Sequence, residues 1–344
     1  SSLPVCRRQR CPDPLLGERL PEGETVFEND GVRLWTDGDD IGVVGFKTKM
    51  HTVSDAVLDG MQEAIGIAER RFKGLVLWQP KEPFSAGADL AGALGALQAG
   101  KLAEFEAMVA NFQATSQRIK YSLVPVVAAV RGLALGGGCE FQMHSARTVA
   151  HLESYIGLVE AGVGLLPAGG GLKEIAVRAS EAAGANGDVF AELKKTFETV
   201  AMAKVSSSAF EAKELGLLRA GDKVAFHAQE LLYIAKQEAL ALHETGYRPP
   251  MPARRIRVAG DVGIATFRML LVNMLEGRFI SAYDDEIATR IATVLCGGDV
   301  DRGAMVDEDW LLKLERKHFV ELAQQEKTQA RIGHMLKTGK PLRN

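Results

Sequence analysis

The chain has 344 residues, enough for one large domain or for a domain with a substantial extension. Its composition is 47% hydrophobic with a formal net charge of −3, which allows a buried core and argues against nucleic acid or an anionic membrane as a partner. No apolar run reaches the roughly 18 residues of a membrane span, and no apolar signal core stands at the N-terminus. The four cysteines are too few for a disulfide framework and lack the spacing of a zinc site, so we expect a reducing, cytoplasmic location and no metal.

The first half of the chain alternates between strand-like and helix-like patterns. Residues 1–24, rich in Pro, Arg and Gly, are predicted to be a linker or leader. Short apolar runs, typical of strands, then take turns along the chain with segments of 3.6-residue periodicity, typical of helices. Strands are predicted over 32–37, 41–47, 74–79 and 124–132, and helices over 54–71 and 101–120. This order is typical of an α/β domain with a mainly parallel sheet.

The second half is predicted to be almost wholly helical. Ala- and Leu-rich periodic segments follow residue 172, and the stretch "YRPPMPARR" at 247–255 is the clearest break between them. The predicted helices cover 172–182, 188–203, 207–216, 224–243, 261–277, 281–296 and 307–337.

The stretch "RGLALGGGCEFQMH" at 131–144 places three glycines directly before a cysteine and a glutamate, after a predicted strand. A dinucleotide-binding loop would need a further glycine where Phe141 stands, so this type of site is poorly supported. A phosphate-binding loop near residue 95 fails because Leu102 replaces the hydroxyl residue that would hold magnesium. The sequence also lacks the H-E-x-x-H and G-x-S-x-G patterns of zinc proteases and serine hydrolases.

The remaining interpretation of the glycines is an oxyanion-binding loop. A strand that ends in bare glycines brings free backbone N–H groups close to a ligand, and a helix that starts there adds its unpaired N–H groups. A second glycine-containing loop, "FSAGADL" at 84–90, also follows an apolar strand. Parallel strands bring such loops to the same sheet edge, so the two loops are expected to meet.

These two loops, together with "YIGLVEAGVGLLPAGGG" at 155–171, resemble the enoyl-CoA hydratase/isomerase (crotonase) superfamily. The resemblance covers roughly residues 30–215 and implies an α/β fold, a crotonase-like ββα spiral core with an extended all-helical C-terminal region. In the family's hydratases one glutamate closes the glycine run and a second lies about twenty residues later. Those positions are Glu140 and Glu160 here, although Val159 stands where the family usually has proline.

The resemblance also assigns the candidate site. It implies that the backbone N–H groups of Ala88 and Gly137 form an oxyanion hole for the thioester carbonyl of an acyl-CoA. It implies that Glu140 activates water and that Glu160 handles the proton of the α-carbon. The residues expected to contact substrate or coenzyme A are Lys47, Lys49, Ala86, Asp89, Leu90 and Gly136.

The implied domains are a leader (1–24), the crotonase core (25–218) and a helical region (219–344) that covers the site, mediates oligomerisation, or both. The stretches at 17–35 and 270–299 resemble the C-terminal half of bacterial fused 3-hydroxyacyl-CoA dehydrogenase/enoyl-CoA hydratase proteins. The resemblance therefore implies a homo-oligomer, or a dehydrogenase domain as partner in the native protein. No cofactor is expected in this chain, since coenzyme A is part of the substrate and NAD would belong to the dehydrogenase half.

The predicted function is hydration of trans-2-enoyl-CoA thioesters in fatty-acid β-oxidation. Two alternatives stay open on the sequence alone: an enoyl-CoA isomerase, and a non-catalytic acyl-CoA-binding module of a larger β-oxidation protein. Two intact glutamate positions favour the hydratase, because isomerases of the family often use a single carboxylate.

Overall fold

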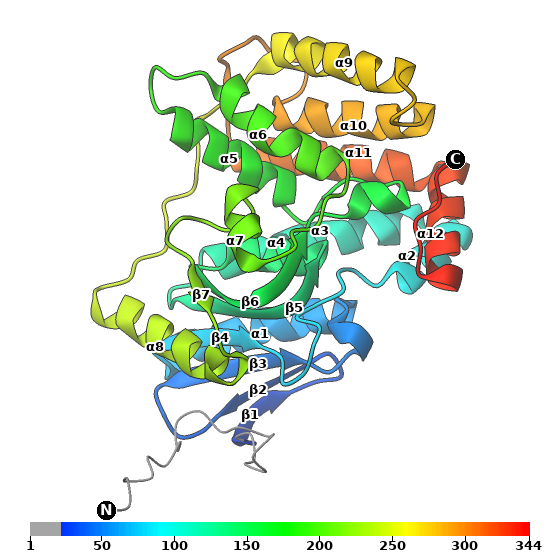
Figure 1. Cartoon of the computed structure of the whole chain (residues 1–344). Helices are drawn as coiled ribbons and strands as arrows, with labels where there is room; N and C mark the ends of the chain where they lie inside the picture. Colours follow the sequence, from blue (N-terminus) through cyan, green and yellow to red (C-terminus); the bar gives the residue numbers. More distant parts are fainter. Residues whose placement is uncertain (1–21) are drawn as a thin grey trace, which may run out of the picture.

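The structure, a computed structural model, describes residues 22–344, so nearly all of the predicted leader lies outside the described residues. A seven-stranded sheet runs in chain order from β1 to β7 (Figure 1). The first three strands pair antiparallel, and every pair from β3 to β7 is parallel. The strands are β1 (Glu24–Glu28), β2 (Val32–Thr36), β3 (Ile41–Phe46), β4 (Gly74–Trp78), β5 (Val126–Leu135), β6 (Arg147–Gly157) and β7 (Lys223–Ala225).

Helices cover both faces of the parallel strands. The helices are α1 (Asp55–Arg71), α2 (Leu90–Gln98), α3 (Leu102–Lys120), α4 (Gly137–His144), α5 (Gly171–Ala183), α6 (Val189–Ala201), α7 (Ala209–Glu214), α8 (Leu231–Glu244), α9 (Gly260–Glu276), α10 (Ala282–Leu295), α11 (Glu308–Ala323) and α12 (Glu326–Thr338). All of β4 is buried, and its alternate side chains enter two cores: Leu75 and Leu77 join the large core with α1 and α4, whereas Val76 joins the core beneath α8. Burial on both faces explains why this strand is a continuous apolar run rather than an alternating one.

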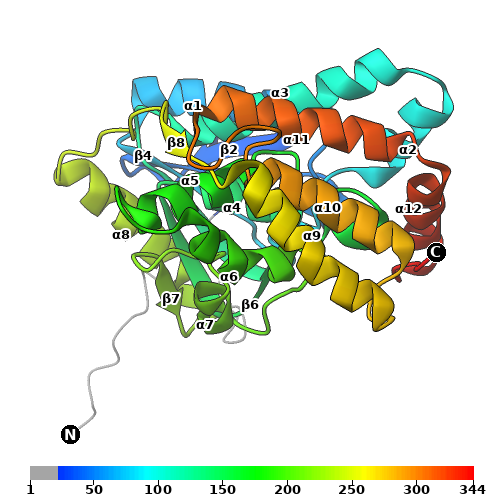
Figure 2. The ribbon, with the colours of Figure 1, turned by 90° about the horizontal axis from the view of Figure 1, so that it is seen from above.

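The C-terminal helices form a layer over one face of the sheet. Figure 1 shows α9, α10 and α11 stacked above the sheet, and Figure 2 shows them from above as neighbouring helices. In this layer α11 packs on α3 and α5, while α12 contacts α2. None of the helices within residues 22–344 is long and apolar enough to cross a bilayer.

The structure corrects several predicted elements. The strands β1 and β6 and the helix α2 were not predicted. The predicted helix over 224–243 begins in the structure as β7, which extends the sheet before α8 starts. The predicted helix over 307–337 is two helices, α11 and α12, separated by Gln324 and Gln325. The region after residue 218 is otherwise helical, apart from the two-residue strands β8 (Ile256–Arg257) and β9 (Met305–Val306).

Candidate functional site

The two glycine loops meet at the carboxyl edge of the sheet, as the sequence predicts. The loop after β4 forms a parallel bridge between Ser85 and Ala134, near the end of β5. Gly87 sits in this loop with a φ of 95°, a region that favours glycine. A Cβ added there would lie 2.9 Å from the Leu135 carbonyl oxygen and 3.5 Å from the Gly137 nitrogen. Glycine at position 87 therefore permits the contact between the loops.

Each loop carries a backbone N–H group that is free to bind a ligand. Gly137 is the first residue of α4, so its N–H has no partner inside the helix. Within residues 22–344, neither this N–H nor that of Ala88 donates a hydrogen bond. The neighbouring Gly136 N–H, in contrast, donates to the Gly157 carbonyl at 2.9 Å. The two amides assigned to the oxyanion hole thus stand on touching loops with unused donors.

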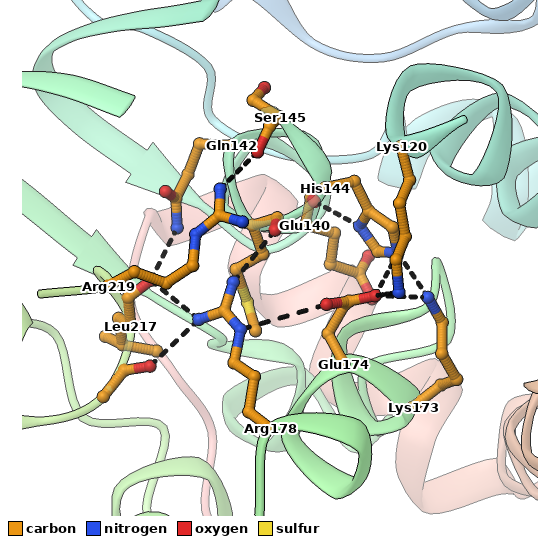
Figure 3. Close-up of polar contacts among 12 residues, drawn as sticks. Lys120, Glu140, Gln142, His144, Ser145, Lys173, Glu174, Arg178, Leu217 and Arg219 are labelled. Carbon is orange, nitrogen blue, oxygen red and sulfur yellow. Dashed lines mark hydrogen bonds and ion pairs between the residues drawn. The ribbon is translucent and has the colours of Figure 1, made fainter. Parts of the chain in front are cut away.

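Glu140 is fixed on the first turn of α4 beside this edge. It is 3% exposed, and its Oε1 accepts hydrogen bonds from the N–H groups of Gly169 at 2.7 Å and Gly171 at 2.8 Å. Its backbone carbonyl accepts from His144 Nδ1 at 2.7 Å (Figure 3). Burial raises the pKa of Glu140 to about 7, and the two loop amides oppose this rise. The carboxyl can therefore gain or lose a proton near neutral pH.

Glu160 begins the 3₁₀ helix η3 (Glu160–Val163), which follows β6. Its Oε1 lies 3.1 Å from the position that a Cβ on Gly136 would occupy, so the carboxyl reaches the glycine run. Its Oε2 is buried without a hydrogen-bond partner in the described part of the chain. Burial, and then the charge of Glu140, raise the pKa of Glu160 well above its usual value. Both effects favour the protonated form of Glu160, and one of its oxygens is left for a ligand.

The remaining predicted contact residues are spread around the first loop. Asp89 caps α2, since its carboxylate accepts from the N–H groups of Ala91 and Gly92, and Leu90 is the first residue of that helix. The Ala86 N–H donates to the Met50 carbonyl at 3.1 Å.

The two predicted lysines lie between the end of β3 and the start of α1. Lys47 pairs with Glu28 at 2.6 Å and also donates to the Asn29 carbonyl at 2.8 Å. Lys49 is exposed and opens the 3₁₀ helix η2 (Lys49–His51). Their contact with coenzyme A stays a prediction.

A third carboxyl lies at the site, Glu315 on α11, which was not predicted from the sequence. It is fully buried, and its oxygens accept from the N–H groups of Gly170 at 3.0 Å and Lys173 at 2.6 Å. Burial, and then the charge of Glu140, raise its pKa to about 8. A signal was present in the sequence, because Glu315 lies within the apolar stripe of its helix, in register with Leu311 and Leu312.

A buried ionic cluster joins α3, α5 and α11, and His144 connects it to the Glu140 backbone. The Nζ atoms of Lys120 and Lys173 contact the Glu174 carboxylate at 2.5 and 2.6 Å (Figure 3), and Lys173 also lies 3.1 Å from Glu308. The pKa of His144, 3.0 Å from Lys173 Nζ, is lowered to about 3 by burial. His144 is therefore neutral, donating through Nδ1 to Glu140 and accepting at Nε2 from Lys173.

Removing the central cation of this cluster is expected to destabilise the fold. In Lys173→Met, the carboxylates of Glu174 and Glu308 would stay buried with only Lys120 as a shared cation. A buried charge left without its partner typically costs roughly 3–5 kcal/mol, so the free energy of unfolding near neutral pH should fall by that amount. Urea denaturation measures it. The exposed Lys195→Met, which breaks a surface pair with Glu192, should change it by less than about 1 kcal/mol; equal losses in both variants would contradict the account of the cluster.

Comparisons with known proteins bear on the family and the fold. The family model described as enoyl-CoA hydratase/isomerase matches residues 39–219. The fold resembles solved structures of an enoyl-CoA hydratase from Bacillus halodurans (TM-score 0.57, 18% identity, 88% of this chain and 98% of that one) and a putative enoyl-CoA hydratase from Streptomyces avermitilis (TM-score 0.58, 17% identity, 90% and 92%). At these identities the structures show the fold alone.

Curated relatives are longer than this chain. A probable 3-hydroxyacyl-CoA dehydrogenase of Bacillus subtilis is 40% identical over 319 residues, which cover 93% of this chain and 40% of the relative. A putative fatty acid oxidation complex trifunctional enzyme of Rickettsia felis is 29% identical over 322 residues, with coverage of 92% and 40%. The chain thus spans about 40% of the length of these relatives.

Proposed function

Because the chain belongs to the enoyl-CoA hydratase/isomerase family, we propose that it adds water to trans-2-enoyl-CoA thioesters in fatty-acid β-oxidation. One observation carries the proposal: Glu140 and Glu160 lie close enough for the charge of one to raise the pKa of the other, at the loop that presents the free Gly137 N–H. Hydration moves two protons, one from water and one to carbon, and a pair of carboxyls in opposite protonation states suits both transfers.

In the proposed step Glu140 is the base and Glu160 the acid. The Glu140 carboxylate takes a proton from water as the water oxygen bonds to the β-carbon. The electron pair of the double bond moves toward the thioester oxygen and forms an enolate, and the α-carbon then takes the proton of Glu160. The product is a 3-hydroxyacyl-CoA, and transfer of a proton from Glu140 to Glu160 restores the starting state. An ionised Glu140 favours the protonated form of the buried Glu160, which supports this assignment of roles.

The N–H groups of Ala88 and Gly137 are proposed to bind the thioester oxygen. The charge on this oxygen grows as the enolate forms, so fixed donors stabilise the transition state more than the substrate. Backbone donors on touching loops are already oriented before the reaction and need little reorganisation. Their free hydrogen-bonding capacity within the described residues supports this role.

The pH dependence of hydration follows from the raised pKa of the base. Glu140 acts only when ionised, and burial moves its ionisation from the usual acidic range to about 7. We expect kcat/KM to rise with pH through about 7 and to be low near pH 5. The profile, recorded with crotonyl-CoA as the enoyl thioester, checks this. A rate that is already maximal at pH 5 would contradict the assignment of Glu140 as the base.

The activity itself is tested with the same substrate. We expect the chain to remove the absorbance of the enoyl thioester and to form 3-hydroxybutyryl-CoA. A chain that leaves crotonyl-CoA unchanged but moves the double bond of a 3-enoyl-CoA to the 2-position would instead be an isomerase. Binding of the thioester without any conversion would identify a non-catalytic acyl-CoA-binding module.

We also propose that hydration here is coupled to oxidation of its product in a longer protein. The Bacillus subtilis relative extends well beyond the matched region and is named a probable 3-hydroxyacyl-CoA dehydrogenase. A 3-hydroxyacyl-CoA is what the proposed hydration yields. NAD would then serve that partner domain, while this chain would need only the coenzyme A carried by its substrate.

A further inference from the structure

Glu315 is the one acid that the C-terminal helices bring to the Glu140 side of the sheet with a strongly raised pKa. It lies in α11, more than 140 residues away in sequence from the loop it contacts. Gln113 of α3 donates a long hydrogen bond of 3.4 Å to Glu315 Oε2, and Arg316 holds Gln113 through its Oε1 at 2.7 Å. The Glu315 side chain is therefore fixed by backbone and side-chain donors from two other helices.

The glycine loop at the start of α5 is shared between Glu315 and Glu140. The N–H groups of Gly169 and Gly171 donate to Glu140. Those of Gly170 and, three residues later, Lys173 donate to Glu315. One carboxyl thus holds the loop from the site and the other holds it from the helical region.

The loop has little freedom to adopt another path. Gly170 has a φ of 103°, and a Cβ there would lie 2.8 Å from the His144 ring. A Cβ on Gly169 would lie 2.4 Å from Glu140 Oε2. Losing one of the two carboxyl anchors should consequently change the direction of the amides that the other receives.

Three titratable groups face the Glu315 carboxyl. Glu140 from α4 acts to keep it protonated, and Lys173 from α5 acts in the opposite direction. Glu160 from η3 is affected in turn, because the charge of Glu315 is among the causes that raise the Glu160 pKa, after burial and Glu140. The third helix in contact, α3, presents the neutral Gln113. Glu315 is thus electrostatically connected to both acids of the proposed reaction.

We propose that Glu315 is a positioning residue of this site: by anchoring the Gly170 amide from α11 it aims the Gly169 and Gly171 amides at Glu140. This inference rests on the proposed hydratase function. The helical region after residue 218 would then take part in the reaction. A change in the packing of α11 would alter the position of the loop that holds Glu140.

The test is the pair of variants Glu315→Gln and Glu315→Asp, assayed in the full chain with crotonyl-CoA. Glutamine has the same shape but offers one acceptor oxygen instead of two, so one of the two amides loses its partner. We expect kcat to fall by roughly 10–100-fold, with KM changed by less than about threefold. We also expect the alkaline limb of the pH profile to move to lower pH, since Glu160 loses one of the charges that raise its pKa. The acid limb should move to higher pH, because the amides of Gly169 and Gly171 lower the pKa of Glu140 only while they point at it.

Aspartate separates geometry from charge. It keeps the negative charge but is too short to hold both amides, so kcat should fall while the alkaline limb stays near its wild-type position. Glu321→Gln, on the same helix and paired with Arg290 at the surface, is the matched control and should leave both kcat and the profile unchanged.

Failures of the two proposals are distinguishable. A wild-type chain that does not hydrate crotonyl-CoA overturns the proposed function and the role of Glu315 with it. An active wild type with an unchanged kcat and pH profile in Glu315→Gln overturns the role of Glu315 alone. If Glu315→Gln does not fold, as judged by thermal unfolding, Glu315→Asp decides, and wild-type turnover in that variant overturns the proposal.

Discussion

Replacing Glu160 by glutamine is expected to lower kcat for hydration by on the order of 10²–10⁴-fold, the range typical of a lost general acid. The amide has no acidic proton for the α-carbon, whereas Glu160 is held protonated by burial and by Glu140. Because size and shape are nearly unchanged, KM should move far less than kcat. Steady-state kinetics with crotonyl-CoA measure both constants.

Two further variants show whether the glutamates act together. Glu140→Gln should depress kcat to a similar extent, and the double variant should be little worse than either single one, because residues that act as a unit are not additive. Glu153→Gln, on the exposed face of β6, is the control and should behave as wild type. Near-normal turnover in both Glu140→Gln and Glu160→Gln would show the assigned mechanism to be wrong.

Gly87→Ala is expected to lower kcat by on the order of 10²–10³-fold, the effect of losing an oxyanion donor. The added Cβ would meet the Leu135 carbonyl oxygen at 2.9 Å and crowd the Gly137 nitrogen at 3.5 Å, and alanine disfavours the φ of 95° at this position. The two loops must then move apart, which separates the donors of Ala88 and Gly137. Since these donors act mainly on the developing charge, kcat should fall more than substrate binding.

Gly95→Ala is the matched control for this variant. Gly95 lies inside α2, and nothing is within 4 Å of an added Cβ, so alanine should leave kcat unchanged. It should also stabilise the helix slightly, by up to about 1 kcal/mol. Wild-type kcat in a folded Gly87→Ala protein would argue against an oxyanion hole between the two loops.

The parallel strands β3, β4 and β5 could be predicted from sequence because they are buried on both faces. A short continuous apolar run such as 74–79 is typical of a strand that is buried on both faces. The parallel strand β6 was missed because polar and charged residues interrupt its apolar pattern. The strand β1 was missed because it is a largely exposed edge strand that begins Glu24-Thr25. The strand β7 was missed because its three residues gain their extended conformation only by pairing with β6, a tertiary contact that no local pattern reports.

The prediction of helix boundaries failed where the sequence has no local stop signal. The chain breaks between α11 and α12 at Gln324 and Gln325, without the Gly or Pro that usually marks such a point. The helix α2 is rich in Ala and Gly and has only one buried residue, Ala93, so its apolar periodicity is weak. Its capping residue, Asp89, was instead assigned to substrate contact.

The site was predicted as far as its residues lie in short motifs. Glu140, Glu160 and the two glycine loops are each identified by neighbours in the sequence, and the parallel sheet brings them to one edge. Glu315 could not be placed in this way, because its contacts with Gly170 and Lys173 depend on how α11 packs over α5. A charged residue inside an apolar helical stripe indicates burial, but not which group it faces.

The most direct measurement of the central claim uses crotonyl-CoA in water labelled with both heavy oxygen and deuterium. If Glu140 and Glu160 hydrate the double bond, mass spectrometry of the product will find one labelled oxygen at the β-carbon and one solvent-derived hydrogen at the α-carbon, and neither will form in Glu140→Gln at a comparable rate. Turnover of the thioester that leaves the β-carbon unlabelled, or equal labelling by wild type and Glu140→Gln, would contradict the account.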